Sequence, residues 1–475
     1  MNNFPIGLTY SDVLLVPKRT PLSSRGQAEL KTKFTKNISL NIPLVSANMA
    51  TVTEADMAIA MAREGGLGVI HQFDTIEQQV AQVRRVKRST CYVIEEPVCI
   101  EPTATIKEAI QIMDDEHVTS LIVTDNSVVG IFTLKDYQFE TNLDKQVREV
   151  MTPREKLITA KPGITLEEAK QILHKNRVEK LPLVDENKQL KGLITTKDIK
   201  KLEYWPNANR DEKGRLRVAA AVGVKDTIER ATALVNANVD LLVLDIAHCH
   251  SDYAIKRIKE LKETFDIDVM AGNIATAEAA RDLIAAGADG LKVGIGPSPV
   301  CTTRIMSGAG IPQFTAVLNV CKVAKEHAVP VTADGGMIYP GDVVKALAAG
   351  ASSIFSGSLF AGTDEAPGRI ITKDGKRYKK YMGSASYDNN HNREELLRKQ
   401  KIKQELDVHV EGIPILVDYK GSVAGIIQNI LKGVQSGISY CGARNIPEMQ
   451  RNAEFIRITP AGWYESQGRG TKMSD

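Results

Sequence analysis

The sequence predicts a (β/α)8 barrel, the TIM-barrel fold, interrupted by an inserted pair of smaller modules. Short apolar segments alternate with helical patterns before residue 91 and again after residue 204. That alternation is typical of parallel strands joined by helices. Between these two stretches, residues 92–203 repeat one pattern twice. We therefore expect an α/β barrel domain from residues 1–91 and 204–475, and an insertion made of modules 92–149 and 150–203.

The overall composition is that of an ordinary globular protein with several domains. The chain has 475 residues, 43% hydrophobic and 25% charged, with a formal net charge of +3. This balance argues against nucleic acid as a partner, and no apolar run is long enough to cross a membrane. The N-terminus has no secretory signal pattern. Six scattered cysteines without a Cys-x-x-Cys pair indicate reduced thiols, so we expect a cytoplasmic protein.

Eight barrel strands are expected, two before the insertion and six after it, each followed by a helix or a polar loop. The strands are predicted at 42–46, 67–71, 217–222, 240–245, 268–271, 290–295, 330–333 and 352–355. The helices are predicted at 54–64, 226–237, 252–264, 276–287, 312–327 and 340–349. In a parallel barrel the chemistry lies where strands end and loops begin, so the polar and glycine-rich loops after these strands are the candidate site.

The insertion repeats a threonine-capped helix, two apolar strands and a final helix opened by Thr-x-Lys-Asp. Residues 102–113 match residues 162–173, and residues 130–136 match residues 192–198. These halves resemble a tandem pair of CBS modules. The resemblance implies that a purine nucleotide binds at Thr133, Asp136, Thr195 and Asp198. By themselves, the same residues are equally suited to capping the final helices.

Cys301 is the candidate nucleophile. It follows a predicted strand and lies in the loop 294–304, which has too much glycine and proline to be regular structure. Thr302, Thr303 and Arg304 follow it, and a nearby cation favours the thiolate. A buried structural cysteine is the alternative, but a place at the end of a barrel strand favours the nucleophile.

Glycine pairs after the last two strands predict a phosphate-binding site. Gly335-Gly336 and Gly357-Ser358 would let backbone N–H groups approach an anion. Asp334 would repel phosphate, so it is expected to accept hydrogen bonds from ribose hydroxyls. Such glycines also occur in simple tight turns. With no His-Asp pair in reach, the cysteine beside this site suits covalent addition to an electron-poor purine or pyrimidine ring better than acyl transfer.

The chain resembles the inosine monophosphate dehydrogenase / guanosine monophosphate reductase family along nearly its whole length. The matching segments are Leu8–Pro17, Gly296–Arg304, Asp334–Gly336 and Tyr440–Ala443, together with the insertion. The resemblance implies that Cys301 attacks purine C2 to form a covalent thioimidate, that Thr303 helps proton transfer, and that Glu411 contacts the base and assists.

The resemblance also implies the binding residues. The substrate would contact Ser46, Asn48, Asp334, Gly335, Gly336, Gly357, Ser358, Gly383, Ser384 and Gly412. The nicotinamide cofactor would contact Asp245, Ile246, Ala247, Gly294, Ile295 and Gly296. A monovalent cation such as K⁺ would lie on carbonyl groups of Gly296, Ser298 and Cys301. However, Ser298 and Pro299 stand where the family has glycine and serine, which predicts a stiffer loop and leaves this cation site open.

Two activities fit the family. A dehydrogenase must hydrolyse the thioimidate with a water activated by an Arg-Tyr pair, and the segment 387–410 contains no such pair. Asn48-Met49 also replaces the Pro-Met usual in dehydrogenases. The inserted modules and the segment 455–462 favour a dehydrogenase instead. We interpret the chain as a GMP reductase, closest to the CBS-containing branch, that uses NADPH, with NADH left open.

The alternatives are an NAD-dependent IMP dehydrogenase and, from a different class, a barrel that senses nucleotides without catalysis. The reductase would have GMP as substrate and IMP as product, while the dehydrogenase would oxidise IMP to XMP. Purine nucleotides are expected as effectors at the insertion. The family resemblance further implies a homotetramer or octamer.

Overall fold

The computed structural model describes residues 4–89, 93–94, 97–116, 118–387, 389, 391 and 410–468, apart from the side chains of residues 198, 201 and 202. The chain divides into two compact units. The larger unit comprises residues 1–89, 207–211 and 216–475, and the smaller comprises residues 90–206 and 212–215. Residues 392–409, which belong to the segment 387–410 that was searched for an Arg-Tyr pair, and Cys91 lie outside the described residues.

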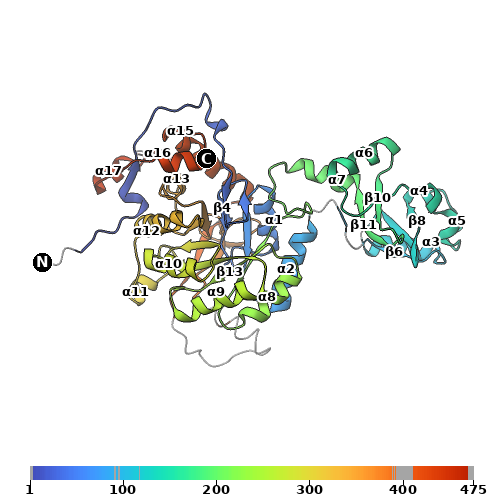
Figure 1. The fold of residues 1–475 in the computed structure, drawn as a ribbon, viewed down its shortest axis with the longest axis horizontal. Helices are drawn as coiled ribbons and strands as arrows, with labels where there is room; N and C mark the ends of the chain where they lie inside the picture. The colour runs from blue at the N-terminus through green and yellow to red at the C-terminus, as the bar shows by residue number, and fades with distance from the viewer. Residues whose placement is uncertain are drawn as a thin grey trace. The chain divides into compact units, whose positions relative to one another are not determined.

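The larger unit contains a closed barrel of eight parallel strands, which confirms the predicted (β/α)8 fold (Figure 1). Its strands are paired in the order β12-β13-β14-β15-β16-β17-β4-β5. They are β4 (Leu44–Ser46), β5 (Leu67–Ile70), β12 (Ala219–Val222), β13 (Leu241–Asp245), β14 (Asp268–Ile274), β15 (Gly290–Val293), β16 (Val331–Asp334) and β17 (Ser353–Ser356).

The barrel closes because its strands are mostly apolar and alternate side chains fill the interior. Strands β5, β12 and β15 are buried at every residue. Ala219, Ala221, Leu241 and Val243 from neighbouring strands belong to one core cluster. This alternation, with every second residue inside, is the packing expected of a small barrel.

The helices lie outside the strands (Figure 1). Most of the residues that they bury are apolar, as in α1 and α12. Ser251 and Thr276 begin two of them by accepting a hydrogen bond from the backbone N–H three residues on. The helices of the βα units are α1 (Ala55–Arg63), α2 (Ile76–Ser89), α8 (Thr227–Asn236), α9 (Asp252–Thr264), α10 (Ala277–Ala285), α12 (Gln313–Glu326) and α13 (Pro340–Ala348).

Two strands end more than one residue away from the predicted position. Strand β15 ends at Val293 and not at Ile295, because the chain turns at Gly294 with φ of +154°. A Cβ on Gly294 would run into the carbonyl oxygen of Asp334, so only glycine fits this turn. Strand β14 continues three residues further than predicted, to Ile274, which carries Asn273 to the same end of the barrel.

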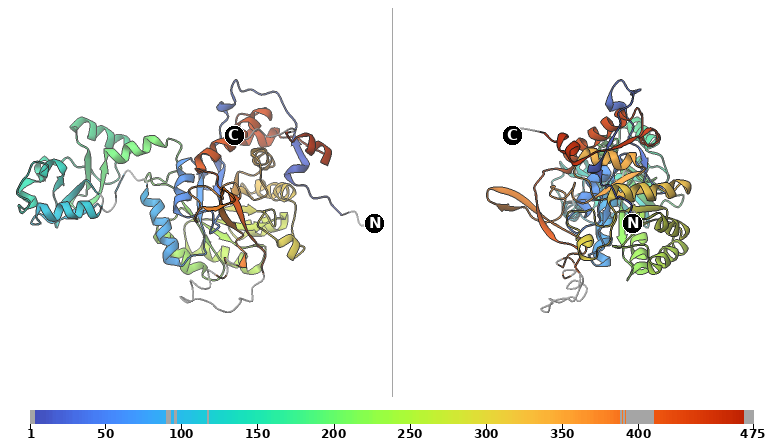
Figure 2. Two further views of the ribbon diagram at one scale, coloured as in Figure 1. Left: turned by 180° about the vertical axis from the view of Figure 1, so that it is seen from behind. Right: turned by 90° about the vertical axis from the view of Figure 1, so that its left-hand side faces the viewer.

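Further elements decorate the barrel. The hairpin of β18 (Ile371–Lys373) and β19 (Lys376–Met382) extends away from it, in orange in Figure 2, and β19 also pairs with β20 (Pro414–Asp418). The N-terminal β1 (Val13–Leu15) pairs with β21 (Phe455–Arg457) near the C-terminus. The others are η1 (Tyr10–Asp12), η2 (Arg25–Gln27), β2 (Thr32–Lys33), β3 (Ser39–Leu40), α11 (Thr303–Met306), α15 (Val423–Tyr440), α16 (Ile446–Asn452) and α17 (Pro460–Glu465).

The smaller unit repeats one order of elements. A capped helix, α3 or α6, is followed by a two-strand antiparallel ladder and a helix that starts at the end of the second strand. Thr105 and Thr165 accept hydrogen bonds from the backbone N–H groups of Glu108 and Glu168. Its elements are β6 (Cys99–Ile100), α3 (Ile106–Asp115), β7 (Ser120–Asp125), β8 (Ser127–Thr133), α4 (Leu134–Tyr137), α5 (Val147–Val150), β9 (Thr152–Pro153), η3 (Arg154–Lys156), α6 (Leu166–Asn176), β10 (Lys180–Val184), β11 (Leu190–Thr195) and α7 (Thr196–Tyr204).

Each half of the smaller unit has an apolar cluster of its own, one around Ile106 and Leu121 and the other around Ala169 and Leu181. Strand β9 pairs with β8 although it falls after the predicted boundary between residues 149 and 150. The boundary and the assignment to CBS modules stay predictions.

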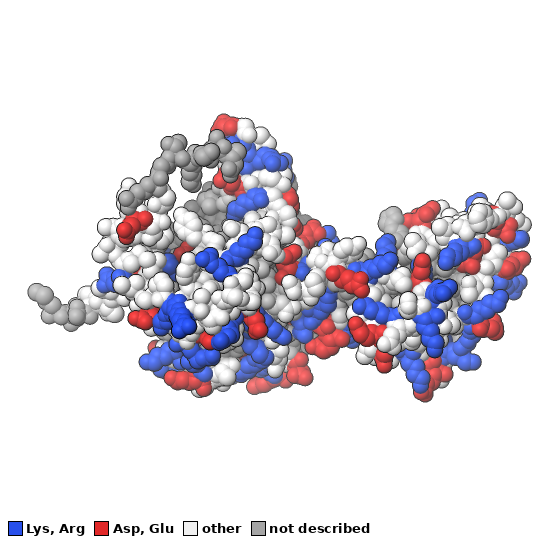
Figure 3. Space-filling model, turned by 90° about the horizontal axis from the view of Figure 1, so that it is seen from above, with Lys and Arg blue, Asp and Glu red and all other residues white. Residues whose placement is uncertain are grey.

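Charges of both signs are interspersed on the face of the molecule drawn in Figure 3. Among the described helices, none is both long and apolar enough to span a bilayer. Nor do the described residues hold a group of three or more His, Cys, Asp or Glu side chains arranged around a metal ion.

Candidate active site

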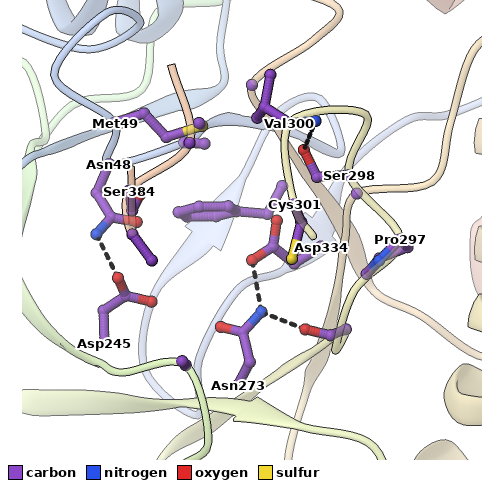
Figure 4. Close-up of a pocket in the computed structure, with 18 of the residues that line it drawn as sticks. Asn48, Met49, Asp245, Asn273, Pro297, Ser298, Val300, Cys301, Asp334 and Ser384 are labelled. Carbon is purple, nitrogen blue, oxygen red and sulfur yellow. Dashed lines mark hydrogen bonds between the residues drawn. The ribbon is translucent and has the colours of Figure 1, made fainter. Parts of the chain in front are cut away.

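A cavity of about 360 Å³ opens at the carboxyl ends of the barrel strands. Residues that directly follow or end β4, β13, β14, β16 and β17 line it, and so does the Cys301 loop after β15. Figure 4 shows side chains from these separate strands, Asn48, Asp245, Asn273 and Asp334 among them, around the space that Cys301 faces. A pocket at this end of a barrel is the ordinary place for a ligand.

Most of the predicted site residues line this one cavity. They are Asn48, Asp245, Ile246, Ala247, Gly294, Ile295, Gly296, Ser298, Cys301, Thr303, Asp334, Gly335, Gly357, Ser358, Gly383, Ser384 and Glu411. Three of the residues predicted for the barrel site do not line it. Ser46 is fully buried, and its hydroxyl accepts a hydrogen bond from Thr53. Gly336 and Gly412 lie just behind the lining, where Gly412 forms a bridge with Cys301.

Cys301, Thr303 and Glu411 form a hydrogen-bonded chain. The Cys301 thiol donates to Thr303 Oγ1 at 3.2 Å, and the Thr303 hydroxyl donates to Glu411 Oε2 at 2.6 Å. The backbone holds the same three residues together, because Thr302 N–H donates to the Glu411 carbonyl oxygen at 2.9 Å. The chain of donors runs from the thiol to the carboxylate, which is the direction in which a thiol proton must leave to give a thiolate.

The Cys301 loop is held in shape from both sides. Arg304 donates to the carbonyl oxygens of Ile295, at 3.1 Å, and Ile311, at 2.6 Å. Burial lowers the pKa of the Arg304 guanidinium, which Cys301 opposes. Arg304 therefore ties the Cys301 loop to the segment that follows α11. That it favours a Cys301 thiolate stays a prediction.

The proposed cation ligands lie in the same loop. Gly296 has a φ of +80°, a conformation that favours glycine. The carbonyl oxygen of Ser298 accepts the Cys301 N–H at 3.1 Å, so it takes part in the loop's own turn. Carbonyl oxygens are suitable ligands for K⁺, but one of the three is already used inside the loop, and the cation site remains a proposal.

The glycine pairs after β16 and β17 lie beside one another. Gly335 and Gly336 have φ of +80° and +81°, and Gly335 N–H donates to the Phe355 carbonyl oxygen. A Cβ on Gly357 would lie 2.6 Å from the hydroxyl of Tyr381, so this position is closed to other residues. Tyr381 is buried, hydrogen-bonds to the Ser298 side chain and has a raised pKa, mainly because of burial.

A buried lysine is the main feature that the sequence prediction missed. Lys292, on β15, has a side chain only 2% exposed. Its Nζ lies 2.7 Å from Asp245 Oδ1 and 2.9 Å from Asp334 Oδ2, and it also hydrogen-bonds to Asn273 Oδ1. Burial lowers the pKa of Lys292, but the two carboxylates outweigh this effect and the pKa is raised. The signal in the sequence was a lysine inside an otherwise apolar strand.

Asn273 and Asn48 complete this network. Asn273 Nδ2 donates to Asp334 Oδ2 at 2.9 Å and to the Gly294 carbonyl oxygen at 2.6 Å. Asn48 Nδ2 donates to Asp245 Oδ2 at 2.8 Å (Figure 4). Both oxygens of Asp245 are therefore fixed, one by Lys292 and the other by Asn48.

Comparison with known proteins identifies the family. Residues 7–469 match the family described as the IMP dehydrogenase / GMP reductase domain. The chain belongs to this family. It is 48% identical over 475 residues to the inosine-5'-monophosphate dehydrogenase of Nitrosopumilus maritimus, covering 98% of both chains. It is 45% identical over 477 residues to the GMP reductase of Leishmania major, covering 97% of this chain and 96% of that one.

Among solved structures, the chain resembles a cysteine-to-alanine variant of the GMP reductase of Trypanosoma brucei in complex with guanosine 5'-monophosphate. The TM-score is 0.90 with 42% identity, and 99% of each chain is covered. Members of the family are oxidoreductases of purine metabolism that use nicotinamide cofactors. The cavity fits such a cofactor, because the apolar side chains of Ile246, Ala247 and Ile295 line it beside the fixed Asp245 carboxylate.

The predicted nucleotide residues of the smaller unit are only partly described. Thr133 and Asp136 bond to each other: the Thr133 N–H and hydroxyl donate to Asp136 Oδ2 at 2.6 and 2.8 Å, which caps α4. Thr195 ends β11 and is largely buried. The side chain of Asp198 lies outside the described residues. The structure thus contains the helix cap at the first position, and nucleotide binding there is a proposal.

Proposed function

We propose that this protein is a GMP reductase, which converts GMP to IMP and ammonia with a reduced nicotinamide cofactor. The observation that carries the proposal is the chemistry around Cys301. A nucleophile and a proton relay are present, but no arginine or histidine lies among the described residues that line the cavity. The sequence of residues 387–410 also has no Arg-Tyr pair. Hydrolysis by a dehydrogenase needs a group that activates water, whereas a reductase needs none.

The first step forms a covalent bond between Cys301 and the purine. The thiol proton passes through Thr303 to Glu411, and the thiolate attacks C2 of the base. Glu411 then returns that proton to the amino group on C2, which leaves as ammonia. The C2–N bond breaks as the C2–S bond forms, so the product is a thioimidate and the enzyme needs no water.

The second step needs a hydride at C2, which a reduced nicotinamide supplies when bound. The C2–S bond then breaks with its electron pair on sulfur, and Cys301 takes a proton back through Thr303. Overall, GMP, reduced cofactor and one proton give IMP, oxidised cofactor and ammonia. The cavity assists by holding its polar groups in fixed positions before the reaction, which lowers the cost of orienting them.

The remaining lining residues are proposed to hold the nucleotide and the cofactor. Asp334 would accept hydrogen bonds from the ribose hydroxyls. The phosphate would be bound by Gly335, Gly336, Gly357, Ser358, Gly383 and Ser384. Asn48, Ser46 and Gly412 would contact or support the nucleotide. Asp245 to Ala247 and Gly294 to Gly296 would hold the nicotinamide, with NADPH proposed and NADH as the alternative.

Two parallel assays test the proposal. The purified protein is incubated with GMP and NADPH or NADH, and separately with IMP and NAD⁺, while cofactor absorbance is followed. We expect cofactor oxidation and ammonia release only with GMP. Cofactor reduction only with IMP would overturn the reductase in favour of the dehydrogenase, and no turnover in either mixture would favour a nucleotide sensor without catalysis.

IMP dehydrogenase is the second candidate, because the Nitrosopumilus maritimus relative at 48% identity carries that name. The two enzymes share the thioimidate and differ in its fate.

The inserted modules are also proposed to bind purine nucleotides that change activity. If Asp136→Ala and Asp198→Ala together leave the response of activity to ATP and GTP unchanged, this regulation is wrong. Light scattering on the purified chain tests the proposed tetramer or octamer.

A further inference from the structure

We infer that Lys292 is a positioning residue that couples the nucleotide and cofactor parts of the cavity. Its ammonium group is bonded to Asp245, which we place at the cofactor, and to Asp334, which we place at the ribose. This inference rests on the proposed binding of both ligands in one cavity, but not on whether the enzyme is a reductase or a dehydrogenase.

The geometry makes Lys292 the link between distant strands. In the barrel order, β14 lies between β13 and β15, and β16 adjoins β15 on the other side. Lys292 on β15 therefore reaches past β14 to Asp245 and also meets Asp334 on the neighbouring strand. Asn273, on the strand between, bonds to both Lys292 and Asp334. A shift of either carboxylate must move the shared ammonium group and so disturb the other.

The charges show why the link matters. One cation lies between two carboxylates in a site where Lys292 is 2% exposed and the carboxylates are 16% and 21% exposed. The Phe355 ring lies against the ammonium group. The charge of Asp245 raises the pKa of the nearby Cys249 thiol, and the charge of Lys292 lowers it. Without the cation, the two carboxylates would face each other in a poorly solvated space and would move apart. Both would then leave the positions that their ligands need.

The main experiment compares Lys292→Met with Lys292→Arg in the full-length protein. For the methionine variant we expect KM to rise for the nucleotide and the cofactor alike, each by roughly 10-fold or more, with a further loss in kcat. Displacement of such groups by about 1 Å can cost about 10²-fold. Lys292→Arg keeps the cation, and its two KM values should stay closer to those of the unchanged protein.

A double-mutant cycle tests the coupling itself. Asp334→Asn should raise KM for the cofactor in the unchanged protein, although Asp334 lies at the ribose. In the Lys292→Met background the same substitution should no longer change the cofactor KM. If Asp334→Asn acts only on the nucleotide in both backgrounds, or if Lys292→Met leaves both KM values unchanged, the inference is wrong.

Lys87→Met is the matched control. Lys87 is also a buried lysine between two aspartates, Asp211 and Asp240, but it does not line the cavity. This variant should melt at a lower temperature with both KM values unchanged. A similar rise in KM in the control would mean that loss of Lys292 acts through the fold alone, which would overturn the inference.

If the unchanged protein turns over neither substrate pair, the proposed function fails. Calorimetry of GMP binding then tests the nucleotide part of the inference. We expect Lys292→Met to lose GMP affinity and Lys292→Arg to keep it.

Discussion

Strand β13 has an aspartate at each end, and each aspartate is held by a buried lysine that also holds a second aspartate. At the amino end, Lys87 bonds Asp240 and Asp211. At the carboxyl end, Lys292 bonds Asp245 and Asp334. In both clusters a buried lysine lies between two carboxylates at similar distances, although Arg217 also lies 3.9 Å from Asp240 in the first. Only the second cluster lies at the cavity.

Solvent access separates the two clusters. The Lys87 cluster is closed, with its three side chains 5–6% exposed. Around Lys292 the ammonium is equally buried, but the carboxylates are 16% and 21% exposed. An ion pair that is closed on all sides can serve only the fold, while carboxylates that face a cavity can also accept hydrogen bonds from a ligand. The same chemistry therefore has two uses, and access to the cavity decides between them.

The largest effect on turnover is expected at the carboxyl end of the barrel, where Cys301 lies. Cys301→Ala should lower turnover by roughly 10⁴- to 10⁶-fold, as loss of a nucleophile does in other enzymes. The melting temperature and GMP binding should be nearly unchanged, because the side chain is small and lies at the cavity. Measurable turnover close to that of the unchanged protein would mean that Cys301 is not the nucleophile.

The proton relay should give the next largest effect. Thr303→Val and Glu411→Gln each remove a member of the hydrogen-bonded chain without changing side-chain size much. We expect kcat to fall by about 10²- to 10⁴-fold, the usual contribution of acid–base groups. The double variant should lose little more than the worse single variant, since both act in one relay. Additive losses would argue for separate roles.

At the amino end the effect should appear in stability and not in catalysis. Lys87→Met removes the ammonium group from two buried carboxylates, Asp240 and Asp211, while Arg217 stays 3.9 Å from Asp240. The loss should cost up to about 3–5 kcal/mol in the free energy of unfolding. Urea melts provide the measurement. In the double variant Lys87→Met/Asp240→Asn, part of this loss should be recovered, because one uncompensated charge is gone.

The pH dependence of the Lys87→Met variant follows from Asp240. Burial raises the pKa of Asp240, and Lys87 opposes this rise. A carboxyl group with a raised pKa in the folded state favours folding below its unfolded pKa, and this contribution is lost as pH rises through the folded pKa. Without Lys87 the rise should be larger. The stability difference between the variant and the unchanged protein should therefore shrink as pH falls toward about 4; an equal difference at pH 4 and pH 7 would contradict this.

The smallest and most local contrast concerns two cysteines near the cavity. Burial raises the pKa of Cys249 to about 12, so at pH 8 only on the order of 10⁻⁴ of it is thiolate. Cys301 lines the cavity. Brief iodoacetamide treatment should modify Cys301, GMP should protect it, and Cys249 should stay unmodified. The exposed Cys99 serves as the control that GMP does not protect. Modification of Cys249 as fast as Cys301 would contradict the described burial.

Much of the barrel could be predicted from local pattern. A strand buried on both sides must be apolar along its length, so segments such as Ala219–Val222 and Leu241–Asp245 were recognisable without any knowledge of their neighbours. The loops that follow them were also recognisable, because polar residues and glycines interrupt the pattern. Cys301, Asp334 and Gly357 were found in this way. Ser46, which the family resemblance implied, is buried and does not line the cavity, since strand periodicity does not tell whether the last residue of a strand faces the cavity or the barrel interior.

The sequence by itself determined which strands form, which loops follow them and that Cys301 lies in one of these loops, because each of these depends on neighbours along the chain. Only the tertiary structure decided which side chains bond to one another in the cavity. Thr303 meets Glu411 across 108 residues, and Lys292 meets Asp334 across 42. Side-chain contacts between strands depend on barrel closure and register, which a single strand does not encode. For this reason the place of Cys301 at the end of a barrel strand could be predicted from the sequence, while the partners of the buried lysine beside it could not.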